Sequence, residues 1–289
     1  MGFESFYHAN YRKLLVFSLS LLLLSVVFLG YKYFSTGSFA DKAVVLKGGL
    51  TLRVDVSENK DIGLLTDFFR SKNIDVSVRA LEGSGRQIAV VFETADMSEN
   101  EFLSLVREAG VVVLPNRYTV EFLGSSLGRN FYRQIVLAAL IAFVAMSVVV
   151  FITFRNPVPS GFVVLAAASD IISTLAVLSL FHFKISTASI AAFLMLIGYS
   201  VDTDILLTTR VLKHKEGSLR ERINSAARTG ITMSLTSLIA MLVGYSFSSN
   251  ETISQIMLVL SIGLVFDMIY TWFQNATILR VYLERRGVL

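Results

Sequence analysis

The feature that constrains this chain most is the gathering of its apolar residues into six windows of about twenty residues each. A helix of about twenty apolar residues spans the roughly 30 Å hydrocarbon core of a bilayer. The windows cover residues 14–33, 131–154, 161–181, 185–212, 229–247 and 252–278. With 54% hydrophobic and only 17% charged residues, the chain is not an ordinary soluble domain. The sequence predicts an α-helical polytopic membrane protein with six transmembrane helices.

The first window stands apart from the other five and follows Arg12 and Lys13. A secretory signal peptide is the alternative interpretation. The apolar core of this window is longer than that of a typical signal peptide, and no convincing small-x-small cleavage site follows it. We therefore expect a retained N-terminal anchor helix.

Between residues 35 and 130 the composition changes to that of a small α+β domain. Alternation over residues 43–56 predicts one long strand, bent at Gly48-Gly49. A helix is expected over residues 61–72, and a hairpin with strands 75–81 and 87–92 around the letters GSGR.

A second helix is expected over residues 98–108, opened by a capping box of Ser98 and Glu101, and a last strand over residues 118–123. The order βαββαβ predicts a ferredoxin-like domain. The predicted domains are an N-terminal segment with the first span (1–34), the α+β domain (35–130), and a five-helix bundle with a C-terminal segment (131–289).

Lysine and arginine in the short loops predict the orientation. One set of loops carries Arg12, Lys13, Arg155, six basic residues between positions 210 and 228, and three after position 279, whereas the opposite short loops carry only Lys184. We expect a multi-pass protein of the cell membrane, with both termini in the cytoplasm and the α+β domain outside. The net charge of +4 is explained by this topology, so we expect no nucleic-acid partner.

Nothing in the sequence indicates a metal site, a cofactor or a nucleotide. There are no cysteines and only three scattered histidines. The phosphate-binding patterns GxxxxGK[ST] and GxGxxG are both absent from the sequence. We expect no cofactor and no catalysis, and any energy the protein uses should come from an ion gradient.

Four carboxylates interrupt the apolar bundle: Asp170, Asp202, Asp204 and Asp267. An ionised Asp at the centre of a lone helix costs about 2.5–3.5 kcal/mol, so these acids should face protein, water or a counter-ion. A functional role is the default interpretation. The alternative is that some of them only hydrogen-bond a neighbouring helix as structural glue.

Asp202 and Asp204 lie two positions apart, or about 200° around a helix, so they cannot point at the same neighbour. One should face the helices of this chain and the other a partner or an aqueous path. This span is the most polar of the six and resembles the lining of a route for a small cation. Buried carboxyls in such a setting can exchange protons. The sequence does not choose between the two acids.

The start of the fifth span offers a counter-ion. Arg228 can reach Asp204 from an antiparallel neighbouring helix, or can instead extend to the membrane interface as one more positive-inside residue. The small residues of spans four and five predict close helix packing rather than a ligand site; they are Gly198, Ser200, Gly230 and Ser234.

With these features in place, the chain resembles the SecF family of protein-export membrane proteins, most closely its archaeal form, over essentially its whole length. The resemblance rests on the letters VEFLGSSLGRN before the second span, ASDIIST around Asp170, GYSVDTDILLTTR in the fourth span, and AARTGITMSLTSL in the fifth. The last of these places Arg228 on the family's functional arginine. The family's fourth-span acid aligns with Thr203, between Asp202 and Asp204, and the family's histidine before Asp170 is Ser169 here.

The resemblance implies an accessory subunit of the Sec translocon that pairs with SecD in a pseudo-twofold assembly related to RND-type transporters. Such a subunit uses the ion-motive force to promote export of polypeptides. Its implied partners are SecD, the Sec translocon pore, exported polypeptides and the lipid bilayer. The candidate ion-coupling residues are Asp202, Asp204, Asp170, Arg228 and Asp267.

Three alternatives remain open at this point. One is half of an RND-like exporter of small solutes or ions, although its external domain would normally be larger. Another is an intramembrane aspartyl protease, but the Gly-x-Gly-Asp and Pro-Ala-Leu signatures are missing. The third is a non-motor scaffold that stabilises the translocon.

Overall fold

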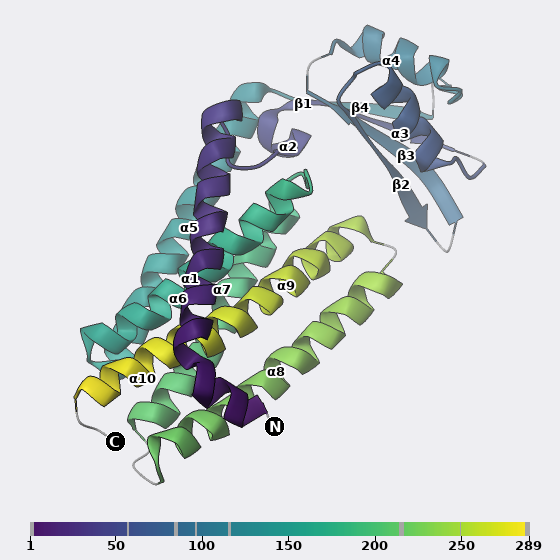
Figure 1. Cartoon of the computed structure of the whole chain (residues 1–289). Coiled ribbons are helices and arrows are strands. Elements are labelled where there is room, and N and C mark those ends of the chain that lie inside the picture. The colour runs from purple at the N-terminus through teal and green to yellow at the C-terminus, as the bar shows by residue number, and fades with distance from the viewer. Residues whose placement is uncertain are drawn as a thin grey trace. The chain divides into compact units, whose positions relative to one another are not determined.

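The computed structural model describes residues 3–56, 58–83, 86–95, 97–114, 117–213, 217–248 and 250–286 (Figure 1). The chain divides into two compact units. The helical unit consists of Met1–Asp41, Ala138–Ser248 and Thr252–Leu289. The sheet unit consists of Lys42–Leu137 with Ser249–Glu251.

Six helices of the described chain are long and apolar enough to cross a membrane, which confirms the six predicted spans. The last span is continuous through a π-helical turn, labelled η1. The elements that form the spans are α1 (Phe3–Thr36), α5 (Ser125–Phe154), α6 (Pro157–Leu180), α7 (Thr187–Leu212), α8 (Leu219–Phe247), α9 (Glu251–Ile269), η1 (Tyr270–Asn275) and α10 (Ala276–Arg285).

Polar residues at the loop ends fix where three of the spans begin. The Asn156 side chain accepts a hydrogen bond from the backbone of Val158 and starts α6. Ser186 forms a capping box with Ser189 at the start of α7. Ser218 forms another at the start of α8. These caps satisfy N–H groups that have no partner within the helix.

The core of the helical unit is made by the central helices α6, α7 and α9–η1–α10. About half of each of these spans is buried within the chain, against only 6% of the α5 span and 11% of the α8 span. Helix α6 packs against α1, α7 and η1, and α7 packs against α8. The exposed faces of α5 and α8 are apolar, so they require lipid or another chain against them.

The sheet unit contains four strands, all antiparallel to their neighbours, in the order β2-β3-β1-β4. The strands are β1 (Gly49–Asp55), β2 (Val76–Gly83), β3 (Arg86–Thr94) and β4 (Tyr118–Leu123), and the helices are α2 (Val44–Lys47), α3 (Ile62–Ser71) and α4 (Glu99–Glu108). Strand β3 lies between β1 and β2, as in a split βαβ unit. The predicted βαββαβ order and ferredoxin-like arrangement are confirmed.

One face of the sheet packs against α3 and α4 to form a small apolar core. Alternate residues of β1 point into it, because successive side chains of a strand lie on opposite faces. Phe69 of α3 and Phe92 of β3 are both fully buried there, with ring centroids 6.0 Å apart. Helix α4 adds Phe102 and Val106.

Two local predictions for this unit are wrong. Residues 43–56 do not form one strand, because α2 precedes β1 and the chain turns at Gly48 (φ 87°) and Gly49 (φ 149°). Such backbone angles suit glycine and end the extended run. Ser98 does precede α4, but its side chain makes no capping hydrogen bond, so the predicted capping box is absent. The middle of the GSGR turn lies outside the described residues.

Candidate functional site

Three of the four predicted acids meet inside the helical unit. Asp170 of α6, Asp204 of α7 and Asp267 of α9 all have 0% exposure. They lie on the three central helices, which supply the buried core of this unit. We call these three residues the carboxyl cluster.

Asp170 is held by a neighbouring helix. The Ser200 hydroxyl of α7 donates to Asp170 Oδ2 at 2.5 Å. The other oxygen, Oδ1, is buried and has no hydrogen-bond partner among the described residues. Asp170 therefore ties α6 to α7 through one oxygen and keeps the other available.

Asp204 is held by the π-helical turn. Thr271 Oγ1 donates to Asp204 Oδ1 at 3.0 Å, and Asn275 Nδ2 donates to the same oxygen at 2.7 Å. Asp204 Oδ2 is buried and, within the described part of the chain, unpartnered. The carboxyl is thus oriented by two neutral donors on one oxygen only.

Asp267 lies where three helices meet. Thr271 Oγ1 is 3.3 Å from Asp267 Oδ1. On the other oxygen, Thr203 of α7 donates at 3.3 Å and Ser234 of α8 at 3.4 Å. These bonds are longer than those to Asp204, so Asp267 is held by more donors but less closely by each.

Further polar contacts extend this arrangement toward α1. Gln274 Nε2 donates to Ser169 of α6 at 3.3 Å. The hydroxyls of Ser173 and Tyr270 are 2.6 Å apart, and Ser25 of α1 donates to Ser173 at 3.1 Å. These contacts are separate hydrogen-bonded groups on the same helices that carry the carboxyl cluster.

All the donors to the carboxyl cluster that the structure describes are neutral hydroxyls or an amide. A buried carboxylate without a positive partner costs several kcal/mol in net desolvation. The free energy of the cluster must therefore depend strongly on how many protons it holds. Chemically, the arrangement can take up, hold and release protons inside the membrane-spanning part of the chain.

The structure separates the two acids of the fourth span, as their 200° spacing predicts. Asp204 is buried in the cluster, whereas Asp202 is exposed on α7. Arg228 is also exposed, on α8. It is not brought to Asp204, because Asp204 turns its carboxyl toward η1. The hypothetical Arg228–Asp204 pair is therefore wrong.

The sequence did not single out the residues of η1. Tyr270, Thr271, Gln274 and Asn275 all contact the polar arrangement, and all are buried. A π-helical turn widens the helix by one residue and is found mostly at functional positions. The signal that pointed to it was present: the letters YTWFQN, with the polar residues Thr271, Gln274 and Asn275, interrupt an apolar span three residues after Asp267.

The prediction of close packing by small residues holds at one glycine and fails at another. At Gly230 of α8, an added Cβ would lie 2.3 Å from the Trp272 ring of η1. At Gly198 of α7, an added Cβ would meet nothing within 4 Å. Ser200 and Ser234, which were assigned to packing, instead donate to carboxyls of the cluster.

A second polar group lies near the C-terminal end of α1. Lys32 Nζ is buried and bonds Asp41 Oδ2 at 3.1 Å and the Ser179 carbonyl at 3.2 Å. His182 Nδ1 is 3.2 Å from the same Asp41 oxygen. Partial burial raises the pKa of the Asp41 carboxyl, but the hydrogen bonds from Lys32 and His182 outweigh it and leave the pKa below its usual value.

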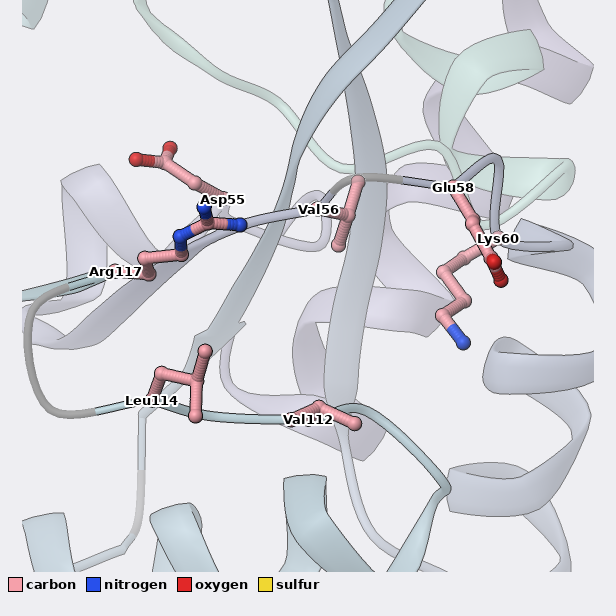
Figure 2. Close-up of a pocket in the computed structure, with 7 residues that line it drawn as sticks. All are labelled: Asp55, Val56, Glu58, Lys60, Val112, Leu114 and Arg117. Atoms are coloured by element: carbon pink, nitrogen blue, oxygen red, sulfur yellow. The ribbon is translucent and has the colours of Figure 1, made fainter.

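The sheet unit contains one described pocket of note, of about 270 Å³. Figure 2 shows Asp55 and Arg117 side by side at one part of its lining and Glu58 and Lys60 at another. The rest of the lining is apolar and consists of Val56, Val112 and Leu114. The described lining holds no nucleophile and no histidine, so we assign it no chemistry.

Comparison with known proteins agrees with this architecture. Residues 107–285 match the family model for the C-terminal region of the protein-export membrane proteins SecD and SecF. The protein-export membrane protein SecF of Pyrococcus furiosus is 37% identical over 279 residues, which cover 95% of this chain and 92% of that protein. SecF of Methanothermobacter thermautotrophicus is 40% identical over 252 residues, covering 86% of both chains.

A solved structure shares the fold. The crystal structure of SecDF, a translocon-associated membrane protein from Thermus thermophilus, superposes with a TM-score of 0.71 at 18% identity. The match covers 96% of this chain but only 38% of the SecDF chain. A second SecDF structure, in the super-membrane-facing form, gives a TM-score of 0.63. By its family match and its relatives of more than 30% identity along nearly the whole length, the chain belongs to the SecD/SecF family of protein-export membrane proteins.

Proposed function

We propose that this chain is an accessory subunit of the Sec protein-export machinery, and that it acts with a SecD-type partner to promote export of polypeptides across the cell membrane. The observation that carries the proposal is the similarity to proteins named SecF over nearly the whole of both chains. The role is one of transport rather than catalysis. The translocon pore and the exported polypeptide are its further partners.

The energy for this action comes from ions that visit the carboxyl cluster. Moving one charge through 100 mV is worth about 2.3 kcal/mol, so a few ions suffice for an ordinary conformational change. Supporting this, Asp204 and Asp170 each keep one buried oxygen that no described residue bonds. Asp204, rather than Asp202, is the acid of the fourth span that takes the coupling role.

Asp202 marks the side on which the partner binds. Its carboxyl is exposed on a membrane-spanning helix, and a charge facing lipid costs about 2.5–3.5 kcal/mol near the bilayer centre. A partner chain over this face of α7 removes that cost. The length of the SecDF chain outside the match is consistent with such a partner.

In this proposal both termini lie in the cytoplasm and the sheet unit lies outside. The support is the positive-inside pattern, with basic residues concentrated in the loop between α7 and α8 and after α10. The buried Lys32 and its partner Asp41 then lie at the outer end of α1. Labelling introduced cysteines tests the orientation directly, because the chain has none of its own.

Replacing the two acids of the fourth span tests the coupling role. In cells that depend on this subunit, Asp204→Asn should abolish the part of the export of a secreted reporter that needs the membrane potential. The matched control is Asp67→Asn, the same change at an exposed position of α3. Unchanged export in the double variant Asp202→Asn with Asp204→Asn would favour the scaffold alternative.

Purification tests the partner. A SecD-type chain should copurify with the wild-type protein from its native membrane, and Asp202→Lys should weaken that association. If the protein instead purifies alone in every mild detergent, an independent solute exporter becomes the better interpretation.

A further inference from the structure

The Thr271 hydroxyl lies between two carboxyls of the cluster. Its oxygen is 3.0 Å from Asp204 Oδ1 and 3.3 Å from Asp267 Oδ1. All three residues are fully buried. Thr271 is therefore the group that joins the acid of α7 to the acid of α9.

A threonine hydroxyl has one hydrogen to donate and lone pairs with which to accept. It can donate to only one of these carboxyls at a time. The second contact is a hydrogen bond only when the other carboxyl carries a proton and donates it to the Thr271 oxygen. The bridge is thus complete when the two acids hold one proton between them.

We propose that Thr271 relays a proton between Asp267 and Asp204, an inference that rests on the proposed use of ions by this subunit. In one direction, the Asp267 carboxyl O–H bond breaks and its proton bonds to Thr271 Oγ1. At the same time the Thr271 O–H bond breaks and that proton bonds to Asp204 Oδ1. The hydroxyl is regenerated, and one proton has moved from α9 to α7.

The other donors to these two acids cannot do this. The Asn275 amide donates to Asp204 but does not release its protons near neutral pH. Thr203 Oγ1 contacts Asp267 at 3.3 Å, but its other contact is the Tyr199 carbonyl at 2.9 Å, so it reaches no second carboxyl among the described contacts. Ser234 contacts Asp267 alone among the carboxyls.

The surroundings of Asp204 suit a carboxyl that receives a proton from the relay. Asn275 and Thr271 orient its Oδ1, while its Oδ2 is buried without a described partner. The Asn275 Oδ1 atom is likewise buried and unpartnered within the described chain. Each of these two oxygen atoms therefore remains able to accept a hydrogen bond.

The π-helical turn is what places the relay. The backbone N–H of Ala276 bonds the Thr271 carbonyl, five residues earlier, rather than the carbonyl four residues earlier. Within this turn, Thr271 and Asn275 both direct side-chain donors at one oxygen of Asp204. The same Thr271 hydroxyl remains within reach of Asp267, one α-helical turn before it.

Proton flux through the reconstituted complex tests the relay. The full-length chain with its SecD-type partner is placed in proteoliposomes, and proton uptake under an imposed potential is followed with a trapped pH-sensitive dye. Thr271→Val, which keeps the shape and removes the hydroxyl, should lower the flux about a hundredfold. Thr271→Ser keeps the hydroxyl and should stay within a few-fold of wild type.

The matched control is Thr174→Val. Thr174 is as buried as Thr271, but its hydroxyl bonds no described residue, so its loss should leave the flux unchanged. Fluorescence of Trp272, the one tryptophan of the chain, reports whether each variant keeps the fold around η1. Where Thr271→Val does not fold, Thr271→Ala makes the same test with less crowding.

The outcomes separate the relay from the proposed function. Wild-type flux in Asp204→Asn overturns the ion-coupling role itself. No flux in Asp204→Asn with wild-type flux in Thr271→Val overturns the relay alone.

Infrared spectroscopy of the purified protein adds a readout that does not depend on transport. The relay predicts that Thr271→Val, but not Thr271→Ser or Thr174→Val, shifts the carbonyl band of the protonated carboxyls. An unchanged band in Thr271→Val overturns the bridge.

Discussion

Replacing Gly230 by alanine tests the close contact between α8 and η1. The added Cβ would lie 2.3 Å from Cζ2 and 2.9 Å from Cη2 of Trp272. Favourable carbon contacts are about 3.5–4.0 Å, so the helix or the ring must move by about 1 Å. The indole is rigid and 3% exposed, and Thr203 Cγ2 closes the other side at 3.3 Å. Overpacking of this kind costs about 1–3 kcal/mol.

A second glycine separates this cost from the general effect of the substitution. Alanine is favoured over glycine in a helix by up to about 1 kcal/mol, which offsets part of the overpacking. Gly198→Ala makes the same change on α7 where nothing lies within 4 Å of the new atom. The difference between the two variants should therefore equal the overpacking cost. Gly263→Ala should be intermediate, because its nearest atoms are the flexible end of Leu196.

Thermal unfolding in detergent, followed by Trp272 fluorescence, measures this difference. At about 2–4 °C per kcal/mol, Gly230→Ala should unfold roughly 5 °C below Gly198→Ala. Its emission should also change before unfolding, because the clash is with the fluorophore. If the two glycine variants unfold at the same temperature with unchanged emission, α8 and η1 do not pack as described.

Three further predictions concern other parts of the chain. Phe69→Ala should destabilise the sheet unit by about 3–5 kcal/mol, seen as faster proteolysis of that unit, whereas Leu64→Ala, 71% exposed on the same helix, should change little. Arg79→Ala should cost the sheet unit about 2 kcal/mol, because it removes the ion-pair partner of the buried Glu93 carboxylate, and Glu93→Gln should cost less in the same proteolysis assay. Asp41→Asn should lower the free energy of unfolding at pH 7 by no more than about 1 kcal/mol, since the carboxyl is partly exposed, and the thermal unfolding midpoint measures this change. The pKa of Asp41 in the folded protein lies below its usual value. The difference in stability between wild type and Asp41→Asn should therefore be present above about pH 4 and should vanish as the pH falls through the folded pKa. A difference that persists in acid would contradict the ion pair.

The number and approximate position of the spans were predictable, because hydropathy over twenty residues depends little on tertiary contacts. The ends of the spans were less predictable. Helix α8 begins at Leu219, ten residues before the predicted start, since its first turns bury Ile223 and Ala226 despite a basic, polar composition. The last span continues through α10 to Arg285 for a similar reason.

The choice between Asp202 and Asp204 was not predictable from the sequence alone. The helical spacing fixes the angle between two side chains but not which one faces the neighbouring helices. That depends on how α7 packs against α6 and η1, and here the packing buries Asp204. The same limit applies to Arg228, which is close to Asp204 in a count of helical turns but faces outward.

The π-helical turn was missed because local sequence seldom specifies one, since its hydrogen-bond pattern is stabilised by contacts elsewhere in the fold. Its residues nevertheless broke the apolar pattern of the span. The acids were singled out because a charged group within a membrane span needs a partner. Uncharged polar groups at this depth also need partners, so the same argument would have found Thr271 and Asn275.

The extra residue in η1 has a consequence for how the C-terminal end of the chain tolerates change. Deleting one residue there would let the turn close into an α-helix and leave α10 close to its present orientation, because a π-helical turn absorbs its extra residue within one wide turn. Leu279 and Leu283 would stay in the apolar cluster they share with Leu14, and Arg280 would stay over the Tyr11 ring, 4.1 Å away. A one-residue deletion in this turn should therefore keep α10 on α1, and its effect should fall on Asp204, whose donors Thr271 and Asn275 it displaces relative to each other.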